Sequence, residues 1–320
     1  MRVAAHIMLL AALLASCMKE ELPAPRAPRG DARTTQLCLG AGYANQLWFD
    51  LGSGEVVSQN PRTAWDLAFE SAPDGWRVLL NGSRLMTAWP LGAVDIAQPH
   101  DTAGLSALRR VDAASLHPDS LAFGDWRGTG GVFIVDLGLA PDGAPMGLRK
   151  LRIDGHGPDS YSITHALIDG TGIASATVAK DPRRSFTCWS FAEGVVPIEP
   201  PAGSWDLCFT QYTHRFDEFS LDYLVNGVLS AATTRVARVT GRDFASIGAS
   251  DTLAFPFWDE RNAIGYDWKV YSFETGSYSI VPDLAFIVKD ADGYLYKLRF
   301  VEFYGPQGQT GCPMFETVPL

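Results

Sequence analysis

Short apolar runs separated by turn residues dominate the chain from residue 37 onward. The runs are rich in Val, Ile, Phe, Tyr and Trp, and clusters of Gly, Pro, Asn and Asp divide them, which is typical of β-strands joined by tight turns. Residues 65–69 (Trp-Asp-Leu-Ala-Phe) place Trp, Leu and Phe on one strand face and Asp and Ala on the other. Helical periodicity is weak, with one short helix expected within residues 102–114 and a helical turn within 241–247. The sequence therefore predicts an all-β, mainly antiparallel fold.

This strand pattern occurs twice, because residues 205–209 (Trp-Asp-Leu-Cys-Phe) repeat residues 65–69. Three further landmarks recur around each copy in the same order: an upstream aromatic segment ending in Val-Val (47–57 and 188–196), an Asn-Gly step (81–82 and 226–227) and an Asp-Gly step followed by Lys (142–150 and 292–297). Asn-Gly and Asp-Gly favour two-residue hairpin turns. Four ordered landmarks indicate an internal duplication. We expect two tandem domains, 37–182 and 183–320, divided at the polar stretch 180–184.

The first residues resemble a targeting segment. Residues 3–14 are mostly apolar after a basic start and are too short to span a bilayer, so residues 1–16 are predicted to be a signal peptide. Leu14-Ala15-Ser16-Cys17 resembles a bacterial lipobox, which makes Cys17 the expected lipidated N-terminus, carrying palmitate. The alternative is an ordinary secretory signal with a chance cysteine. Met18, in place of Asp, argues against retention in the inner membrane and favours a lipid anchor in the outer membrane. Residues 17–36 are expected to form a flexible tether.

Composition narrows the function classes. The chain carries 36 acidic and 26 basic residues, a net charge of −10, and so lacks the basic footprint of a nucleic-acid-binding protein. No further stretch is long and apolar enough for a transmembrane helix.

Four cysteines follow Cys17, and they have no CxxC spacing, so we expect no zinc site. In an exported protein they invite disulfides. We favour the pairs Cys188–Cys208 and Cys38–Cys312 among the three pairings, while cysteine as a small core residue is the alternative.

Motifs for catalysis are absent from the sequence. There is no GxSxG elbow, phosphate-binding loop or dinucleotide fingerprint, and the five histidines after residue 6 form no metal-ligand pair. Asp66 and Asp206 sit in the repeated strand, where a carboxylate that accepts a hydrogen bond from an adjoining loop is a more ordinary role than catalysis. Carboxylates that meet only in the folded chain would leave a hydrolase open. We expect a binding protein, not an enzyme.

The repeated motifs resemble those of a known family. A lipobox, an aromatic strand ending in Val-Val, a Trp-Asp-Leu-x-Phe strand leading to Asn-Gly, and a final Asp-Gly hairpin with Lys, Leu and Phe together resemble the HmuY family. The second half meets the pattern at 188–196, 205–209, 226–227 and 292–300, and the first half meets it more weakly at 48–57, 65–69, 81–82 and 142–150. The similarity spans most of residues 45–320.

This resemblance implies two tandem HmuY-like β domains on a surface-exposed outer-membrane lipoprotein. It also implies a haemophore-like protein that binds haem and passes it to a TonB-dependent receptor, with iron held by two His or Met side chains. The family's ligand His in an aromatic-Ser-His step is replaced here by Phe273, which cannot ligate iron. The remaining candidates are His214, His165 and Met86 as ligands, with Trp268 and Tyr271 stacking on the ring. A binding or scaffold lipoprotein for a glycan or a partner protein is the alternative.

Overall fold

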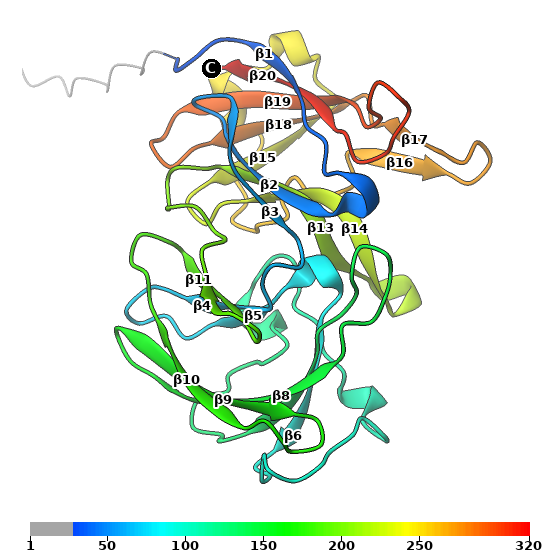
Figure 1. The fold of residues 1–320 in the computed structure, drawn as a ribbon. Coiled ribbons are helices and arrows are strands. Elements are labelled where there is room, and N and C mark those ends of the chain that lie inside the picture. The colour runs from blue at the N-terminus through cyan, green and yellow to red at the C-terminus, as the bar shows by residue number, and fades with distance from the viewer. Residues whose placement is uncertain (1–27) are drawn as a thin grey trace, which may run out of the picture.

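The all-β fold predicted from the hydrophobic pattern is confirmed. The structure is a computed structural model that describes residues 28–320, so Cys17 and the predicted signal peptide lie outside the described residues. Four sheets of four or five strands and one two-stranded hairpin make up this part of the chain, and the strands pair antiparallel. Figure 1 shows them as two stacked bodies, an upper and a lower one. Within residues 28–320, no helix has the length and apolar character needed to cross a membrane.

The lower body is built from two sheets around one core. The first sheet has the order β10-β9-β8-β7-β6 and the second the order β12-β11-β4-β5. Phe69, Leu151, Tyr161 and Trp189 meet in the core between them. The strands are β4 (Leu67–Glu70), β5 (Val78–Leu80), β6 (Thr87–Gly92), β7 (Val132–Asp136), β8 (Leu148–His156), β9 (Ser160–Leu167), β10 (Ala174–Ala179), β11 (Phe186–Ser190) and β12 (Gly194–Val196).

The upper body repeats this arrangement with sheets β1-β20-β19-β18-β15 and β14-β13-β2-β3, beside the hairpin β16-β17. Phe49, Phe209, Trp268 and Phe300 lie in its core. The strands are β1 (Arg33–Gln36), β2 (Asn45–Asp50), β3 (Glu55–Pro61), β13 (Leu207–Phe216), β14 (Leu221–Ser230), β15 (Arg235–Thr240), β16 (Lys269–Ser272), β17 (Ser277–Ile280), β18 (Leu284–Lys289), β19 (Leu295–Glu302) and β20 (Met314–Pro319).

The two bodies exchange hairpins. The β2–β3 hairpin pairs with β13 in the upper body, Phe49 lying opposite Leu207, and β11–β12 pairs with β4 in the lower body, Trp189 lying opposite Leu67. Each Trp-Asp-Leu strand is thus completed by the aromatic hairpin that precedes the other copy. The strand pairing therefore crosses the expected boundary between residues 182 and 183 in both directions.

The two repeated aspartates hold the exchanged hairpins. The Phe191 N–H donates to Asp66 Oδ2 at 2.7 Å, and the Leu51 N–H donates to Asp206 Oδ2 at 2.9 Å. Both carboxylates are buried, so each interaction is strong and costly to lose. These contacts match the role predicted for the two aspartates, which was to accept a hydrogen bond from an adjoining loop.

Local predictions fail at three places. Asn81 and Gly82 follow β5, where Asn81 caps the 3₁₀ turn Gly82–Arg84, and they form no hairpin turn. Asn226 and Gly227 lie inside β14 rather than in a hairpin turn, and residues 102–114 contain only one short 3₁₀ turn. A Cβ on Gly227 would lie 2.5 Å from the Gly265 carbonyl oxygen, so this glycine serves a close backbone approach. The described 3₁₀ turns are η2 (Ala41–Tyr43), η3 (Gly82–Arg84), η4 (Ser106–Leu108), η5 (Pro118–Ser120), η6 (Asp217–Phe219), η7 (Phe244–Ser246) and η8 (Ala249–Leu253).

The four cysteines within residues 28–320 divide into one disulfide and two thiols. Cys38 and Cys312 form a disulfide that ties the segment after β1 to the segment before β20. Cys188 and Cys208 are free and buried. The expected pair does not form because Cys188 lies opposite Ala68 on β4, whereas Cys208 lies opposite Trp48 in the other body's sheet.

Candidate functional site

A half-buried histidine lies on the longest hairpin of the fold. The β13–β14 hairpin continues well past its counterpart, β4–β5, and places His214 opposite Tyr223. Residues two apart share a strand face, and Phe216 accordingly packs on His214 with ring centroids 4.7 Å apart. Tyr223 is 57% exposed. The extension of this hairpin therefore carries imidazole and aromatic side chains toward solvent.

A loop from the same body adds a tyrosine to this surface. Gly265 pairs with Val228 of β14 through two backbone hydrogen bonds of 3.0 and 3.2 Å. This pairing sets Tyr266 over His214, with ring centroids 4.7 Å apart and Tyr266 Oη 3.4 Å from His214 Nε2. We call His214, Phe216, Tyr223 and Tyr266 the aromatic face.

Burial keeps the imidazole of the aromatic face uncharged. Burial lowers the pKa of His214, and the nearby carboxylates of Asp217 and Asp267 only partly offset this effect. Burial also raises the pKa of Tyr266. At neutral pH the face therefore presents a neutral imidazole, which is the form that ligates metals, beside a neutral phenol.

The β16–β17 hairpin extends this apolar surface. Tyr271 contacts Phe273 and Tyr278 with ring centroids 5.2 and 5.0 Å apart, and Phe273 is 93% exposed. Burial is the main cause that raises the pKa of Tyr278, and the charge of the nearby Tyr223 adds to it. Tyr223 of β14 therefore lies near the β16–β17 hairpin. Figure 1 shows β16–β17 and β14 on the same side of the upper body. Phe273, which stands where the resemblance implies a ligand His, is thus an exposed phenyl ring.

Two predicted residues do not reach any surface. Met86 is 1% exposed in the lower core, where the Arg84 Nη2–H donates to its sulfur at 3.1 Å. Trp268 is also 1% exposed and stacks on Phe300 with centroids 3.8 Å apart. Because both side chains fill close-packed cores, neither reaches a ligand at the surface. The sequence pattern identified them as candidates by type, but burial depends on the packing of distant strands.

His165 lies apart from His214. It is half-buried on β9 of the lower body, where its ring lies 5.5 Å from that of Phe191 and 6.4 Å from that of Trp189. Its aromatic neighbours belong to the β11–β12 hairpin, whereas those of His214 belong to the upper body. The three predicted ligands are therefore not brought together. Sequence reasoning missed Phe216, Tyr223 and Tyr266, although the aromatic run at 265–271 was a signal for Tyr266.

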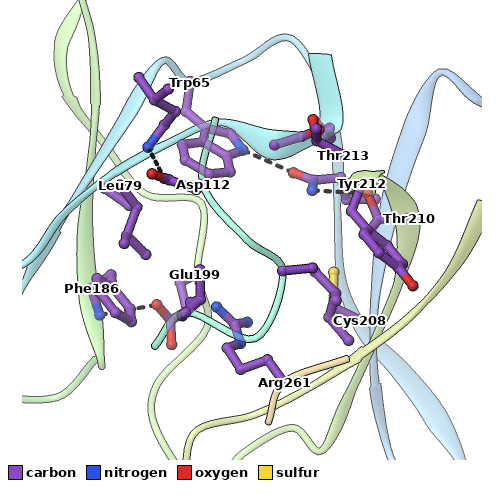
Figure 2. A pocket seen from close by; sticks show the side chains of 18 of the residues that line it. Trp65, Leu79, Asp112, Phe186, Glu199, Cys208, Thr210, Tyr212, Thr213 and Arg261 are labelled. Atoms are coloured by element: carbon purple, nitrogen blue, oxygen red, sulfur yellow. Dashed lines mark hydrogen bonds between the residues drawn. The ribbon is translucent and has the colours of Figure 1, made fainter. Parts of the chain in front are cut away.

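A small cavity lies between the two bodies, lined by residues of both (Figure 2). It has a volume of about 90 Å³, and Cys188, Cys208, Glu199 and Arg261 contribute to its lining. Burial raises the pKa of both thiols and of the Glu199 carboxyl. Pockets that enclose a drug-sized ligand measure roughly 300–1,000 Å³, so this cavity holds only small molecules such as water.

An open groove of about 650 Å³ lies beside the β11–β12 hairpin. Residues 179–184 and 195–199 form its walls, and its lining contains no His, Met or Tyr. The groove has the size of a ligand site, and the one residue of a haem-ligating type in its lining is Cys188, whose thiol is buried and has a raised pKa. Nowhere in residues 28–320 do three or more His, Cys, Asp or Glu side chains cluster as a metal site would require.

Comparisons with known proteins point to one family. The family model described as HmuY protein matches residues 42–316. Apo PinO from Porphyromonas gingivitis is 11% identical, with a TM-score of 0.33, over 91% of this chain and 98% of its own. A Bacteroides vulgatus protein described as HmuY-like and heme-binding is 14% identical, with a TM-score of 0.22, over 52% of this chain and 96% of its own. The apo HmuY analog of Tannerella forsythia is 10% identical, with a TM-score of 0.25, over 91% of this chain and 99% of its own. Among curated proteins, none matches the sequence.

Proposed function

The chain belongs to the HmuY family, and on this basis we propose that it is a surface lipoprotein that binds haem or another planar tetrapyrrole. The observation that carries this proposal is the aromatic face, where the half-buried rings of Phe216 and Tyr266 pack on a neutral, half-buried imidazole beside the exposed Tyr223. Flat apolar ligands stack on such rings, and imidazole and phenolate both ligate haem iron. The side chains present therefore fit a tetrapyrrole.

Each side chain of the aromatic face has a distinct task in this proposal. Phe216 and Tyr223 supply apolar area for the flat ring, while the exposed Tyr271 and Phe273 of the β16–β17 hairpin shield it from water. The His214–Tyr266 pair supplies the atoms that reach iron. When bound, the tetrapyrrole supplies the iron centre. The internal cavity has no part, because its volume excludes a macrocycle.

A hemin titration of a soluble form beginning at residue 18 tests this function. We expect saturable binding with a sharpened Soret band, weakened in His214→Ala. His165→Ala is the matched control, since burial likewise lowers the pKa of this half-buried histidine, and it should bind as the parent does. Featureless, non-saturable binding by the parent would exclude a haem carrier. Equal weakening in both variants would place the ligand elsewhere.

We further propose that Cys17 carries the lipid anchor and that the bound tetrapyrrole is passed to a TonB-dependent receptor. The lipobox at 14–17 supports the anchor, and family membership supports the transfer. Labelling of cells with a palmitate analogue should mark the parent chain. Cys17→Ala should abolish labelling and release the protein from the outer membrane.

A second candidate function is binding of a different ligand on the same fold. The 650 Å³ groove beside β11–β12 favours it, because its size suits a small molecule and its lining has no His, Met or Tyr. Val195, 52% exposed, lines this groove. If hemin fails to bind, Val195→Arg offers a direct test, since it should abolish binding of a groove ligand and leave the aromatic face unchanged.

A further inference from the structure

Strand β10 is a sheet edge that lacks the usual protection against further pairing. It ends the sheet β10-β9-β8-β7-β6 and pairs with β9 in regular register from Ala174 to Ala179. Its six residues, Ala-Ser-Ala-Thr-Val-Ala, include no charge and no proline. We propose that β10 pairs antiparallel with β10 of a second copy of this chain, which joins the two sheets across a two-fold axis. This pairing does not involve the aromatic face.

The other edges of the four large sheets within residues 28–320 are blunted, as edge strands of natural proteins usually are. β6 contains Pro90, shifts its register beside that residue and is bridged by Arg110. β14 is bridged by Gly265, and β15 by Trp258. β5 and β12 have three residues each, and β1 and β3 begin with a charged residue. In this part of the chain, β10 is therefore the edge that remains open to another strand.

The free hydrogen-bonding groups of β10 belong to alternate residues. The Lys180 N–H donates to the Asp159 carbonyl at 2.8 Å, on the β9 side. Because the direction alternates along an antiparallel strand, the N–H and C=O groups of Ser175, Thr177 and Ala179 point away from β9. No backbone hydrogen bond links these three residues to another segment of the described chain. All three residues are exposed, so a further strand has access to them.

A second copy meets these groups in a symmetric register. With Thr177 on the two-fold axis, Thr177 lies opposite Thr177 of the copy, and Ser175 lies opposite Ala179 of the copy. Each of these is a hydrogen-bonded pair, in which the two residues exchange both N–H···O=C bonds. Threonines directly opposite each other also interact favourably. The net charge of −10 opposes association of two chains, but β10 itself adds no charge to this repulsion.

An exposed isoleucine favours a second copy over an unrelated extended peptide. Ile173, directly before β10, is 50% exposed. When the register continues past the strand end, Ile173 lies opposite Asp181 of the copy, beside Ala179, where the groove of about 650 Å³ begins. The lining of this groove includes Val195, which is 52% exposed. Each copy therefore covers the groove of the other with Ile173, and both apolar side chains lose contact with water.

Site-specific cross-linking tests the register. In Thr177→Cys the two thiols face each other on the axis, where the Cα atoms of a hydrogen-bonded pair are about 5.5 Å apart. We expect a short thiol-specific reagent to link the soluble form beginning at residue 18 into a covalent dimer. Ser175→Cys is the matched control, because each Ser175 lies about 14 Å along the strands from its symmetry mate, and it should stay unlinked. No linkage in Thr177→Cys, or equal linkage in both variants, would overturn the pairing.

Sedimentation over a range of concentrations tests the dimer without a cross-link. A single strand pair is a small interface, so the parent should shift reversibly from one chain to two as its concentration rises. Thr177→Lys and Thr177→Glu should each lose the dimer, and their mixture should regain it, because opposite charges then face each other.

Ser162→Lys is the control for added charge, since Ser162 is exposed and pairs with Thr177 from β9, one strand in from the edge. It should dimerise as the parent does, and tryptophan fluorescence should show that each variant is folded. A parent that stays monomeric throughout would overturn the proposal and leave β10 to an extended segment of another protein. A dimer that persists in both Thr177→Lys and Thr177→Glu would also overturn it, since the copies would then meet elsewhere.

Discussion

Removal of the Asp66 carboxylate should destabilise the fold more than any surface substitution. Asp66 Oδ2 accepts the Phe191 N–H of the exchanged hairpin, while Oδ1 pairs with the Arg84 guanidinium. The Arg84 side chain is 1% exposed, and its other polar contacts are weak ones, to the Thr63 carbonyl at 3.4 Å and the Met86 sulfur. In Asp66→Ala, a buried cation loses its counter-ion.

The magnitude follows from these contacts. Removing one partner of a buried ion pair costs about 3–5 kcal/mol, and an unsatisfied half-buried N–H costs about 1–3 kcal/mol more. We therefore expect the free energy of unfolding to fall by about 4–8 kcal/mol. A domain stable by about 5–15 kcal/mol would then be close to unfolding at room temperature.

Urea unfolding followed by tryptophan fluorescence measures the effect. Asp119→Ala is the control, because the Asp119 side chain is 93% exposed and should change stability by less than about 0.5 kcal/mol. The double variant Asp66→Ala/Arg84→Met removes both charges and should recover part of the loss, with Arg84→Met as the second single variant. A change below about 1 kcal/mol in Asp66→Ala, or strict additivity in the double variant, would refute the reasoning.

Three further predictions concern other parts of the fold. Burial raises the pKa of Asp206 to about 7, so the native state keeps a proton that the unfolded chain loses near pH 4. The free energy of unfolding measured in urea should therefore fall as the pH rises from 4 to 7. Asp206→Asn should make this fall smaller. Gly227→Ala places a methyl group 2.5 Å from the Gly265 oxygen and should cost about 1–3 kcal/mol by overpacking, whereas Gly157→Ala, with no atom within 4 Å, should be neutral in the same urea assay. Cys188 and Cys208 should react with a thiol reagent only after unfolding; if no thiol appears in urea, they are oxidised.

The alternation of apolar and polar residues within short segments was sufficient to predict the all-β fold from the sequence. Alternation in residues 65–69 and 205–209 put Leu67, Phe69 and their repeats in the cores, because strand geometry alone alternates the faces. The lysines that recur in the two copies were also recognisable from the sequence, and both have the same structural role. Each donates hydrogen bonds to carbonyls of a neighbouring turn. Lys150 donates to Ile96 and Gln98, and Lys297 donates to Phe244, Ala245 and Ile247.

The local sequence pattern could not predict which aromatic hairpin pairs with which Trp-Asp-Leu strand. Both aromatic hairpins offer the same hydrogen bonds to both Trp-Asp-Leu strands, so the sequence is degenerate between pairing within a copy and exchange between copies. Only the tertiary structure pairs β2 with β13 and β11 with β4. The same exchange puts Cys188 and Cys208 in different sheets, which a pairing argument from neighbouring strands did not anticipate.

The candidate site shows the same division. His214 could be named from the sequence because its residue type ligates metals and it follows the repeated strand. Its partner Tyr266 lies 52 positions away and reaches it only because Gly227 lets the Gly265 backbone approach β14. Met86 and Trp268 were equally plausible by type, but long-range packing buries them. Residue chemistry is local, whereas exposure and proximity are set by contacts between segments far apart in the chain.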